Sequence, residues 1–260
     1  MLEEIEKQLD GISAKEASRK KQLDDNLSAK EIPQETHAEN SGNSFASIPA
    51  QKAGGEKPEL PFEGLRIGVA VCGSFCTFKK VFETTERLRA MGAEIIPIMS
   101  FNASSISSRF GKAEENLALF ESLAGRKAIV TIEDAEPIGP KKMTDVMLLP
   151  NCTGNTMAKL AMSITDTPVT MAVKSHLRGG RPVVVNVATN DALSGSAKNI
   201  GALMNLRHYY FVPLRQDDHK KKPTSVVGDF LLIPDTITSA LKGVQLQAVL
   251  RAPQGGAEIS

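Results

Sequence analysis

The residues with the clearest chemical potential stand in a turn between a predicted strand and a predicted helix, where Ile67 to Val81 reads IGVAVCGSFCTFKKV. An apolar run ends at Gly73 and Ser74, and a helix starts directly afterwards. Free backbone N–H groups and the positive end of that helix suit a phosphate. Glycine lets an anion approach the backbone, and the serine hydroxyl adds a donor. We therefore predict a phosphate-binding turn, and the alternative is an ordinary tight turn of an α/β domain.

Other polar turns follow predicted strands further along the chain. FNASSISSRFG follows a strand that ends at Ser100, NCTGNTMAKLA follows DVMLLP, and TNDALSG follows RPVVVNVA. In an open α/β sheet the carboxyl ends of the strands hold the ligand. The turns at Gly73, at Thr153 to Thr156 and at Thr189 to Asn190 are therefore expected to form one crevice. Such a crevice would bind an elongated ligand, with its phosphate at one end and its ring at the other.

No set of residues typical of a catalytic triad or a metal site is present. The histidines, at positions 37, 176, 208 and 219, are scattered, and G-x-S-x-G is absent. Cys72, Cys76 and Cys152 form no paired C-x-x-C sets, so we expect free, buried thiols and no metal. The chemistry should then come from a cofactor. The turn holds one glycine rather than G-x-G-x-x-G, and no ribose-binding acid follows about 20 residues later. FMN is therefore favoured over NAD.

Composition and charge restrict the class of protein. The chain has 260 residues, 41% of them hydrophobic, and a formal net charge of +1, so neither nucleic acid nor an acidic surface is indicated as a partner. No apolar run approaches the roughly 20 residues that span a bilayer, and MLEEIEKQLD does not resemble a signal peptide. We expect a cytoplasmic protein without membrane contact.

From Leu65 onward, β-branched apolar runs alternate with helical patterns, which predicts an α/β fold: a parallel sheet with helices on both faces. One helix should run from a Thr77 cap to about Met91, with Gly92 as its stop, and another from about Lys112 to Leu123. The predicted strands include EIIPIMS, KAIVTI, DVMLLP with a stop at Pro150, and YYFVP. FNASSISSRFG, EDAEPIGPKK and LRQDDHKKKP are predicted to be loops.

Residues 1–62 differ from the predicted domain of residues 63–260. Leu2, Ile5, Leu9 and Ile12 recur at helical spacing, and residues 33–61 are rich in Pro, Gly, Ser and Gln. Residues 1–60 carry 8 Lys and Arg against 12 Asp and Glu. We predict a charged helical segment and a disordered linker. The helix could dock a partner or remain a solvated helix.

Several of these motifs together resemble one protein family. CGSFCTF, LPNCTGNTMAKLA, TDTPVTMAVKSHLR, TNDALS and FVPLRQDD with KPTS are similar to the flavoprotein subunits of dipicolinate synthases, within the wider family of flavin-containing decarboxylase-like proteins. The resemblance covers about Leu65 to Leu250. It implies a three-layer, flavodoxin-like (Rossmann-type) domain that binds FMN in a homo-oligomer, with the flavin lodged where subunits meet.

The resemblance also implies which residues bind the flavin. Gly73, Ser74 and Ser100 would hold the phosphate; Thr153, Gly154 and Thr156, with the matching Asn155, would hold the ribityl chain and ring edge; and Thr189 with Asn190 would lie on the far side. Phe75 would flank the flavin or pack beneath it. Two segments depart from the decarboxylase pattern. Phe101-Asn102 stands where many relatives have a histidine, and Ala188-Thr189-Asn190 replaces Pro-x-Met-Asn.

The activity that the resemblance implies is that of a flavin-dependent oxidoreductase, which oxidises dihydrodipicolinate to pyridine-2,6-dicarboxylate in the mother cell of a sporulating bacterium. An NAD(P)-type partner, similar to the A subunit of dipicolinate synthases, would act alongside. A dicarboxylate needs cations, for which Arg109, Lys174, His176 and Arg178 are the candidates. The catalytic acid and base are not assigned. The alternatives are an FMN-dependent decarboxylase of small acids and a non-catalytic flavin-holding or scaffolding protein.

Overall fold

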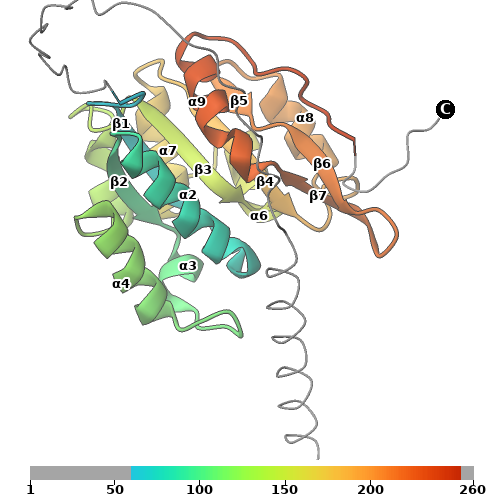
Figure 1. Cartoon of the computed structure of the whole chain (residues 1–260), viewed down its shortest axis with the longest axis horizontal. Coiled ribbons are helices and arrows are strands. Elements are labelled where there is room, and N and C mark those ends of the chain that lie inside the picture. The colour runs from blue at the N-terminus through green and yellow to red at the C-terminus, as the bar shows by residue number, and fades with distance from the viewer. Residues whose placement is uncertain (1–59, 253–260) are drawn as a thin grey trace, which may run out of the picture. The chain divides into compact units, whose positions relative to one another are not determined.

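The computed structural model describes residues 60–252, and the predicted helix and linker of residues 1–59 lie outside them. Figure 1 shows one twisted sheet between two layers of helices. Within the described residues the sheet has seven strands, in the order β2-β1-β3-β4-β7-β6, with β5 pairing β4. The strands are β1 (Arg66–Val71), β2 (Glu94–Met99), β3 (Val146–Cys152), β4 (Val183–Thr189), β5 (Tyr209–Phe211), β6 (Leu214–Asp218) and β7 (Lys222–Gly228).

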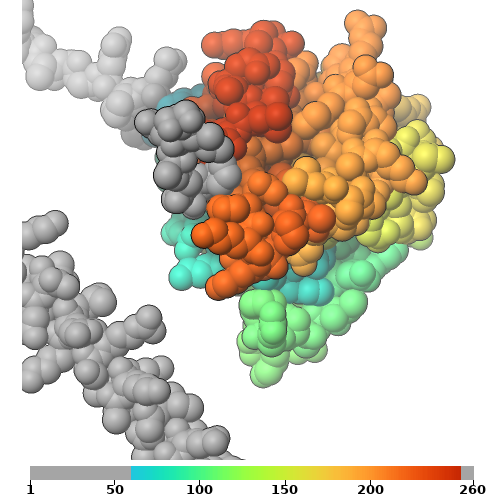
Figure 2. Space-filling model, turned by 90° about the vertical axis from the view of Figure 1, so that its right-hand side faces the viewer, coloured from blue at the N-terminus to red at the C-terminus, as the bar shows by residue number. Residues whose placement is uncertain are grey.

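The sheet is mixed rather than wholly parallel. β1, β2, β3, β4 and β5 are joined by parallel pairs. β7 runs antiparallel to β4 and to β6. The predicted α/β fold is confirmed, and the predicted all-parallel sheet is corrected at this one end. In Figure 2 the β6–β7 hairpin, in orange, faces the viewer at that end of the sheet.

Alternate residues of each central strand enter two separate cores, which creates the three layers. Val69, Leu148 and Val184 pack with the front helices in Figure 1, and Ala70, Leu149 and Val185 pack with the helices behind. The front helices are α2 (Phe78–Ala90), α4 (Ala113–Ala124) and α9 (Ile233–Leu241). The rear helices are α5 (Ile132–Ala135), α6 (Gly154–Ala161), α7 (Pro168–Leu177) and α8 (Ala197–Met204). Phe62, placed in the extension from the sequence, is 4% exposed and belongs to the front core.

Two predicted helix boundaries can be checked against the local geometry. Gly92 follows α2 with φ of +95°, and Gly125 ends α4 in the left-handed conformation, as expected for helix stops. Thr77 stands at the N-cap of α2, but its side chain makes no capping hydrogen bond, and its hydroxyl donates to the Ser74 carbonyl oxygen at 2.6 Å. A 3-10 turn, η1 (Phe75–Thr77), precedes the helix and includes Thr77.

The predicted strand KAIVTI is wrong. Only Ile129 pairs with β2: its N–H donates to the Pro97 carbonyl at 2.8 Å, and its carbonyl accepts from the Met99 N–H at 3.0 Å. The next bond along this edge would need an N–H on Pro97, which proline lacks. On the other side, the Thr131 side chain accepts from the Asp134 N–H and starts α5.

The three predicted loops contain regular structure. FNASSISSRFG begins with the short helix α3 (Phe101–Ser105), and EDAEPIGPKK contains most of α5 and the 3-10 turn η2 (Glu136–Ile138). LRQDDHKKKP forms most of the β6–β7 hairpin, in which the Asp218 carboxylate accepts from the Lys220 and Lys221 N–H groups. The prediction of loops from their polar composition was wrong because short side-chain caps, and not apolar periodicity, start these elements.

Pro150 does not end β3, which continues to Cys152. The pairing of β3 with β4 shifts register between Leu149 and Cys152, so a bulge accommodates the proline. The Asn186 side-chain amide on β4 donates to the Pro150 carbonyl at 2.7 Å and replaces a ladder bond. Proline in a central strand is therefore stabilised by a side chain from the neighbouring strand.

Candidate flavin site

The carboxyl ends of β1, β2 and β3 border a pocket of about 430 Å³. It is lined by Gly73, Ser100, Phe101, Asn102, Thr153, Asn155, Thr156, Lys159, Asp166 and Thr167. The structure thus brings together five of the residues that the sequence assigned to FMN, namely Gly73, Ser100, Thr153, Asn155 and Thr156. They come from three separate strand-to-helix turns, which meet because the three strands are neighbours in the sheet.

The turn after β1 leaves space and a free donor beside this pocket. The Ser74 N–H donates back to the Cys72 carbonyl at 2.9 Å, whereas the Gly73 N–H has no acceptor among residues 60–252. A Cβ on Gly73 would meet Asn102 Cβ at 3.5 Å and the Phe75 ring at 3.9 Å, which are ordinary contacts. Packing within the described chain therefore does not require glycine at this position. Close approach of a ligand to the backbone would explain it.

The turn after β3 is shaped by a helix cap. The Thr153 hydroxyl accepts from the Thr156 N–H at 3.3 Å and lies 3.1 Å from the Thr156 hydroxyl. The N–H groups of Gly154 and Asn155, in the first turn of α6, are left for water or a ligand. Ser100 plays the same part at α3, where its hydroxyl accepts from the Ala103 N–H at 3.3 Å. Ser100 and Thr153 are thus helix caps and pocket residues at once.

The third predicted turn does not line this pocket. The Thr189 hydroxyl donates to Asp191 Oδ1 at 2.5 Å, and the Ser196 hydroxyl donates to the same oxygen at 2.9 Å. These hydrogen bonds lower the pKa of Asp191, and the bond from Thr189 has the largest effect. Asn190 is bound by β7 through its carbonyl, which accepts from the Thr224 hydroxyl at 2.7 Å. The loop abuts Gly154, whose added Cβ would lie 3.0 Å from both Thr189 Oγ1 and Asp191 Oδ1.

Other residues predicted for the flavin lie beside the pocket rather than in it. Ser74 does not line it, and Phe75 lines a separate groove of about 440 Å³ with Phe110 and Leu119. Two charged residues in the pocket were missed from the sequence: Lys159 on α6 pairs with Asp166 at 2.8 Å. The sequence feature that could have revealed them is the TDTP segment after α6, in which an acidic residue and a capping threonine precede α7.

A sequence model of the Flavoprotein family matches residues 57–227. The chain belongs to the flavoprotein family. The dipicolinate synthase B subunit of Bacillus subtilis (strain 168) is 45% identical over 188 residues, which are 72% of this chain and 94% of that relative. The crystal structure of the dipicolinate synthase B subunit from Bacillus halodurans C is 37% identical, with a TM-score of 0.68, over 74% of this chain and 98% of that one.

More distant flavoproteins share the fold. The crystal structure of the FMN-dependent cysteine decarboxylase SpaF is 22% identical, with a TM-score of 0.52, over 69% of this chain and 98% of that one. This likeness concerns the architecture alone. The resemblance stated from the motifs is therefore confirmed at the level of the family, and the flavodoxin-like fold is confirmed with it.

The cations predicted for a dicarboxylate do not gather at the pocket of this flavoprotein. Arg109 is exposed in the loop before α4, with its guanidinium 4.9 Å from the centre of the Phe110 ring. Lys174 and Arg178 lie near the end of α7 and line a different pocket, of about 330 Å³. α7 carries them away from the carboxyl ends of the strands. Among residues 60–252, the one cation that lines the candidate site is Lys159.

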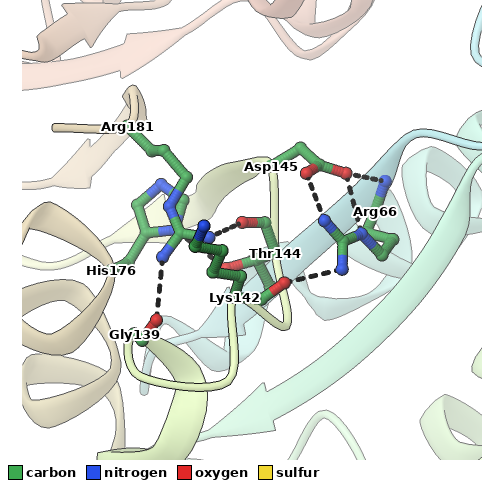
Figure 3. Close-up of polar contacts among 7 residues, drawn as sticks. All are labelled: Arg66, Gly139, Lys142, Thr144, Asp145, His176 and Arg181. Atoms are coloured by element: carbon green, nitrogen blue, oxygen red, sulfur yellow. Dashed lines mark hydrogen bonds and ion pairs between the residues drawn. The ribbon is translucent and has the colours of Figure 1, made fainter. Parts of the chain in front are cut away.

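His176 was predicted to contact the substrate, and that prediction is wrong. The side chain is fully buried at the amino end of the sheet, in the polar cluster of Figure 3. Its Nε2 donates to the Pro182 carbonyl at 3.0 Å, since a carbonyl can only accept, so Nδ1 accepts from the Thr144 hydroxyl at 2.8 Å. Both ring nitrogens are used inside the protein, and the ring has a structural role.

The same cluster contains an ion pair that joins two strands. Arg66 at the start of β1 donates to both carboxylate oxygens of Asp145, at 3.0 and 2.6 Å, and to the Lys142 carbonyl (Figure 3). The hydrogen bond from Arg66 is the main cause that lowers the pKa of Asp145. Arg181 donates to the Thr144 carbonyl at 2.6 Å. These contacts join the amino ends of β1 and β3, at the end of the sheet opposite the pocket.

His176 should make the stability of the domain depend on pH. Burial is the main cause that lowers its pKa from the ordinary 6.5 to about 4. The unfolded chain therefore takes up a proton near pH 6.5 that the folded chain refuses until about pH 4, so stability is lost as pH falls through this window. The loss should reach roughly 3 kcal/mol. Urea unfolding of the native chain and of His176→Gln across this range measures it.

The expected result for His176→Gln is a shallower dependence of the free energy of unfolding on pH. His219→Gln, in the exposed hairpin turn, is the matched control and should keep the native slope. An unchanged slope in His176→Gln would show that the buried ring does not control this dependence.

The other features of the described residues add little to the site. Cys72 and Cys152 are free, buried thiols, as expected, whereas the free thiol of Cys76 is exposed, which corrects the expectation for that residue. Burial is the main cause that raises the pKa of Cys152. Within residues 60–252, no group of three or more His, Cys, Asp or Glu side chains could hold a metal ion, and no helix is long and apolar enough to cross a membrane.

Proposed function

We propose that this chain is the FMN-binding subunit of a dipicolinate synthase, and that it acts in the oxidation of dihydrodipicolinate to pyridine-2,6-dicarboxylate. The observation that carries the proposal is the pocket at the ends of β1, β2 and β3, with an open glycine turn and two helix caps. The 45% identity to the B subunit of a dipicolinate synthase supports the choice of reaction. The proposal includes the mother cell of a sporulating bacterium as the place of action.

The residues present fit the phosphate end of FMN. The free N–H of Gly73, the first N–H groups of α6 and the hydroxyls of Ser100, Thr153 and Thr156 are donors around one space. Lys159 adds a positive charge, partly balanced by Asp166. Such donors bind a phosphate strongly because the hydrogen bonds are charge-assisted. FMN bound there would supply the acceptor for the hydride that the dihydropyridine ring loses when it becomes aromatic, and the proton that the ring also loses would pass to solvent.

In this reaction the chain's own residues would bind and orient the cofactor and the substrate. Gly73, Ser100 and the first turn of α6 would hold the phosphate and so orient the cofactor. Thr189, Asn190, Ser74 and Phe75 border the site from outside the pocket, and we propose that they act through the turns they support. Arg109, in the exposed loop between α3 and α4, remains the proposed contact for a substrate carboxylate.

The proposal includes partners. Phe101 lines the pocket and is 44% exposed, so a neighbouring protomer of a homo-oligomer would cover apolar surface at the open side of the pocket. An NAD(P)-type partner, similar to the A subunit of dipicolinate synthases, would reoxidise the flavin or prepare the substrate. An FMN-dependent decarboxylase and a flavin-holding protein without its own chemistry are the competing functions.

Purified full-length chain should bind FMN and show flavin absorption bands after removal of free flavin. Under anaerobic conditions, the dihydropyridine dicarboxylate should bleach the bound flavin, with pyridine-2,6-dicarboxylate as the product. The NAD(P)-type partner should allow repeated turnover. Failure to take up FMN would overturn the flavin proposal. Release of carbon dioxide would favour a decarboxylase, and bleaching that needs the partner's active site would favour a flavin-holding protein.

A further inference from the structure

A buried asparagine holds the turn that carries Gly73. Asn151, on β3, is fully buried, and its Oδ1 accepts from the Cys72 N–H at 2.8 Å. Its Nδ2 donates to the Cys72 carbonyl at 2.9 Å and lies 3.5 Å from the Ser74 carbonyl. One side-chain amide therefore pairs both backbone groups of the residue before Gly73.

This arrangement replaces a part of the sheet that cannot form. The register of β1 with β3 extends to Val69↔Leu148, after which β3 reaches Pro150 and its bulge. Proline offers no N–H, so the backbone ladder cannot continue to Cys72. A side-chain amide has the same donor and acceptor as a peptide group, so Asn151 supplies the missing pair. Asn186 makes the corresponding bond on the other side, to the Pro150 carbonyl.

The same bonds determine the shape of the turn. The Cys72 carbonyl also accepts from the Ser74 N–H, so Cys72, Gly73 and Ser74 form one closed turn whose base is Asn151. The remaining donor in that turn is the Gly73 N–H, at a residue that lines the pocket. A loss of the Asn151 amide would leave the buried Cys72 N–H unpaired and the Cys72 carbonyl with the Ser74 N–H as its remaining partner, and the turn would have to move to satisfy the N–H.

We infer that Asn151 is a positioning residue, which holds the Cys72–Ser74 turn so that Gly73 can receive the flavin phosphate. The inference rests on the proposed binding of FMN. It differs from a purely structural role in one measurable respect. A positioning residue for the phosphate should affect FMN far more than riboflavin, which has the same ring and ribityl chain but no phosphate. A residue that only stabilises the core should affect both ligands equally.

The test measures the affinities of the full-length chain for FMN and for riboflavin, by calorimetry, in the native protein and in Asn151→Ala. We expect the native preference for FMN to fall roughly tenfold or more in the variant, as suits one or two lost charge-assisted bonds. Thr144→Val is the matched control, because it removes another buried hydrogen bond, to His176, at the opposite end of β3. It should lose stability and keep the native preference.

Asn151→Asp keeps the inference testable if Asn151→Ala does not fold. A protonated aspartic acid has the shape of asparagine and can still accept from the Cys72 N–H and donate to the Cys72 carbonyl, but an ionised one cannot donate. Its preference for FMN, relative to the native protein at the same pH, should therefore fall as pH rises.

The outcomes separate the two claims. A native protein that binds FMN no better than riboflavin overturns the phosphate site, and the inference with it. A native protein that prefers FMN, with variants that keep the full preference, overturns the role of Asn151 alone.

Discussion

Gly73→Asp is expected to weaken the binding of FMN by at least a hundredfold and to leave the domain folded. A carboxylate at this position would stand beside the dianionic phosphate in the pocket. Two like charges about 4 Å apart repel by about 4 kcal/mol at the effective dielectric constant near a protein surface. The domain should still fold, because a Cβ on Gly73 meets nothing closer than 3.5 Å.

Gly73→Asn is the matched control, since it has nearly the same shape without the charge. It should cost FMN affinity only through the space that it occupies, and should bind riboflavin as Gly73→Asp does. Calorimetric titration of both variants gives the comparison, and circular dichroism with thermal unfolding shows whether each is folded. Equal FMN affinities for the two variants would mean that the phosphate lies elsewhere.

Gly154→Val is expected to separate the second turn from the third, with a loss of about 3 kcal/mol in the free energy of unfolding and a large loss of flavin affinity. An added Cβ would overlap Ser196 Oγ and lie 3.0 Å from Thr189 Oγ1 and Asp191 Oδ1. These atoms cannot easily move, because the Thr189 and Ser196 hydroxyls both bind Asp191. The start of α6, which carries Asn155 and Thr156 into the pocket, would shift instead.

Gly201→Ala is the control for this substitution. Gly201 lies within α8, and a Cβ there meets no atom within 4 Å. Alanine should stabilise the helix by about 0.5–1 kcal/mol and leave flavin binding unchanged. Urea unfolding and FMN titration on both variants provide the test. A Gly154→Val protein with native stability and native FMN affinity would show that the contact between the two loops is not important.

The parts of the site that depend on local sequence were predictable. Gly73 at the end of an apolar strand predicts a turn, and Thr153 before α6 predicts a helix cap. Each prediction needs only a few residues of chain. β1, β2 and β3 are parallel neighbours, as the general rules for α/β sheets favour. The polar turns that follow them therefore lie together at the carboxyl ends of the strands. Of the three turns expected to form one crevice, those at Gly73 and at Thr153 to Thr156 line the pocket and the one at Thr189 to Asn190 does not, whereas Ser100 was assigned from the family resemblance.

The parts that depend on contacts between distant segments were not predictable. Nothing near Pro150 shows that Asn186, on another strand, will bind its carbonyl, so the strand was ended two residues early. Nothing near His176 shows that its ring nitrogens are taken by Thr144 and Pro182. Thr189 looks like a ligand residue in the sequence, but Asp191 two positions later binds its hydroxyl.

Asn151 shows the same limit in the opposite direction. In the sequence it was assigned no role. Its importance appears only when β1 lies beside β3 and the backbone groups of Cys72 need partners. A side chain that replaces a peptide group can be recognised from the hydrogen bonds of the folded chain and not from local patterns.

The central claim, that the ends of β1, β2 and β3 hold the phosphate of FMN, is tested most directly by a crystal structure of the full chain with FMN bound. We predict the phosphorus atom in the pocket bordered by Gly73, Ser100 and Thr153, with the Gly73 N–H donating to a phosphate oxygen. A phosphate bound in the groove beside Phe75 and Phe110, or against the loop of Thr189 and Asp191, would contradict it.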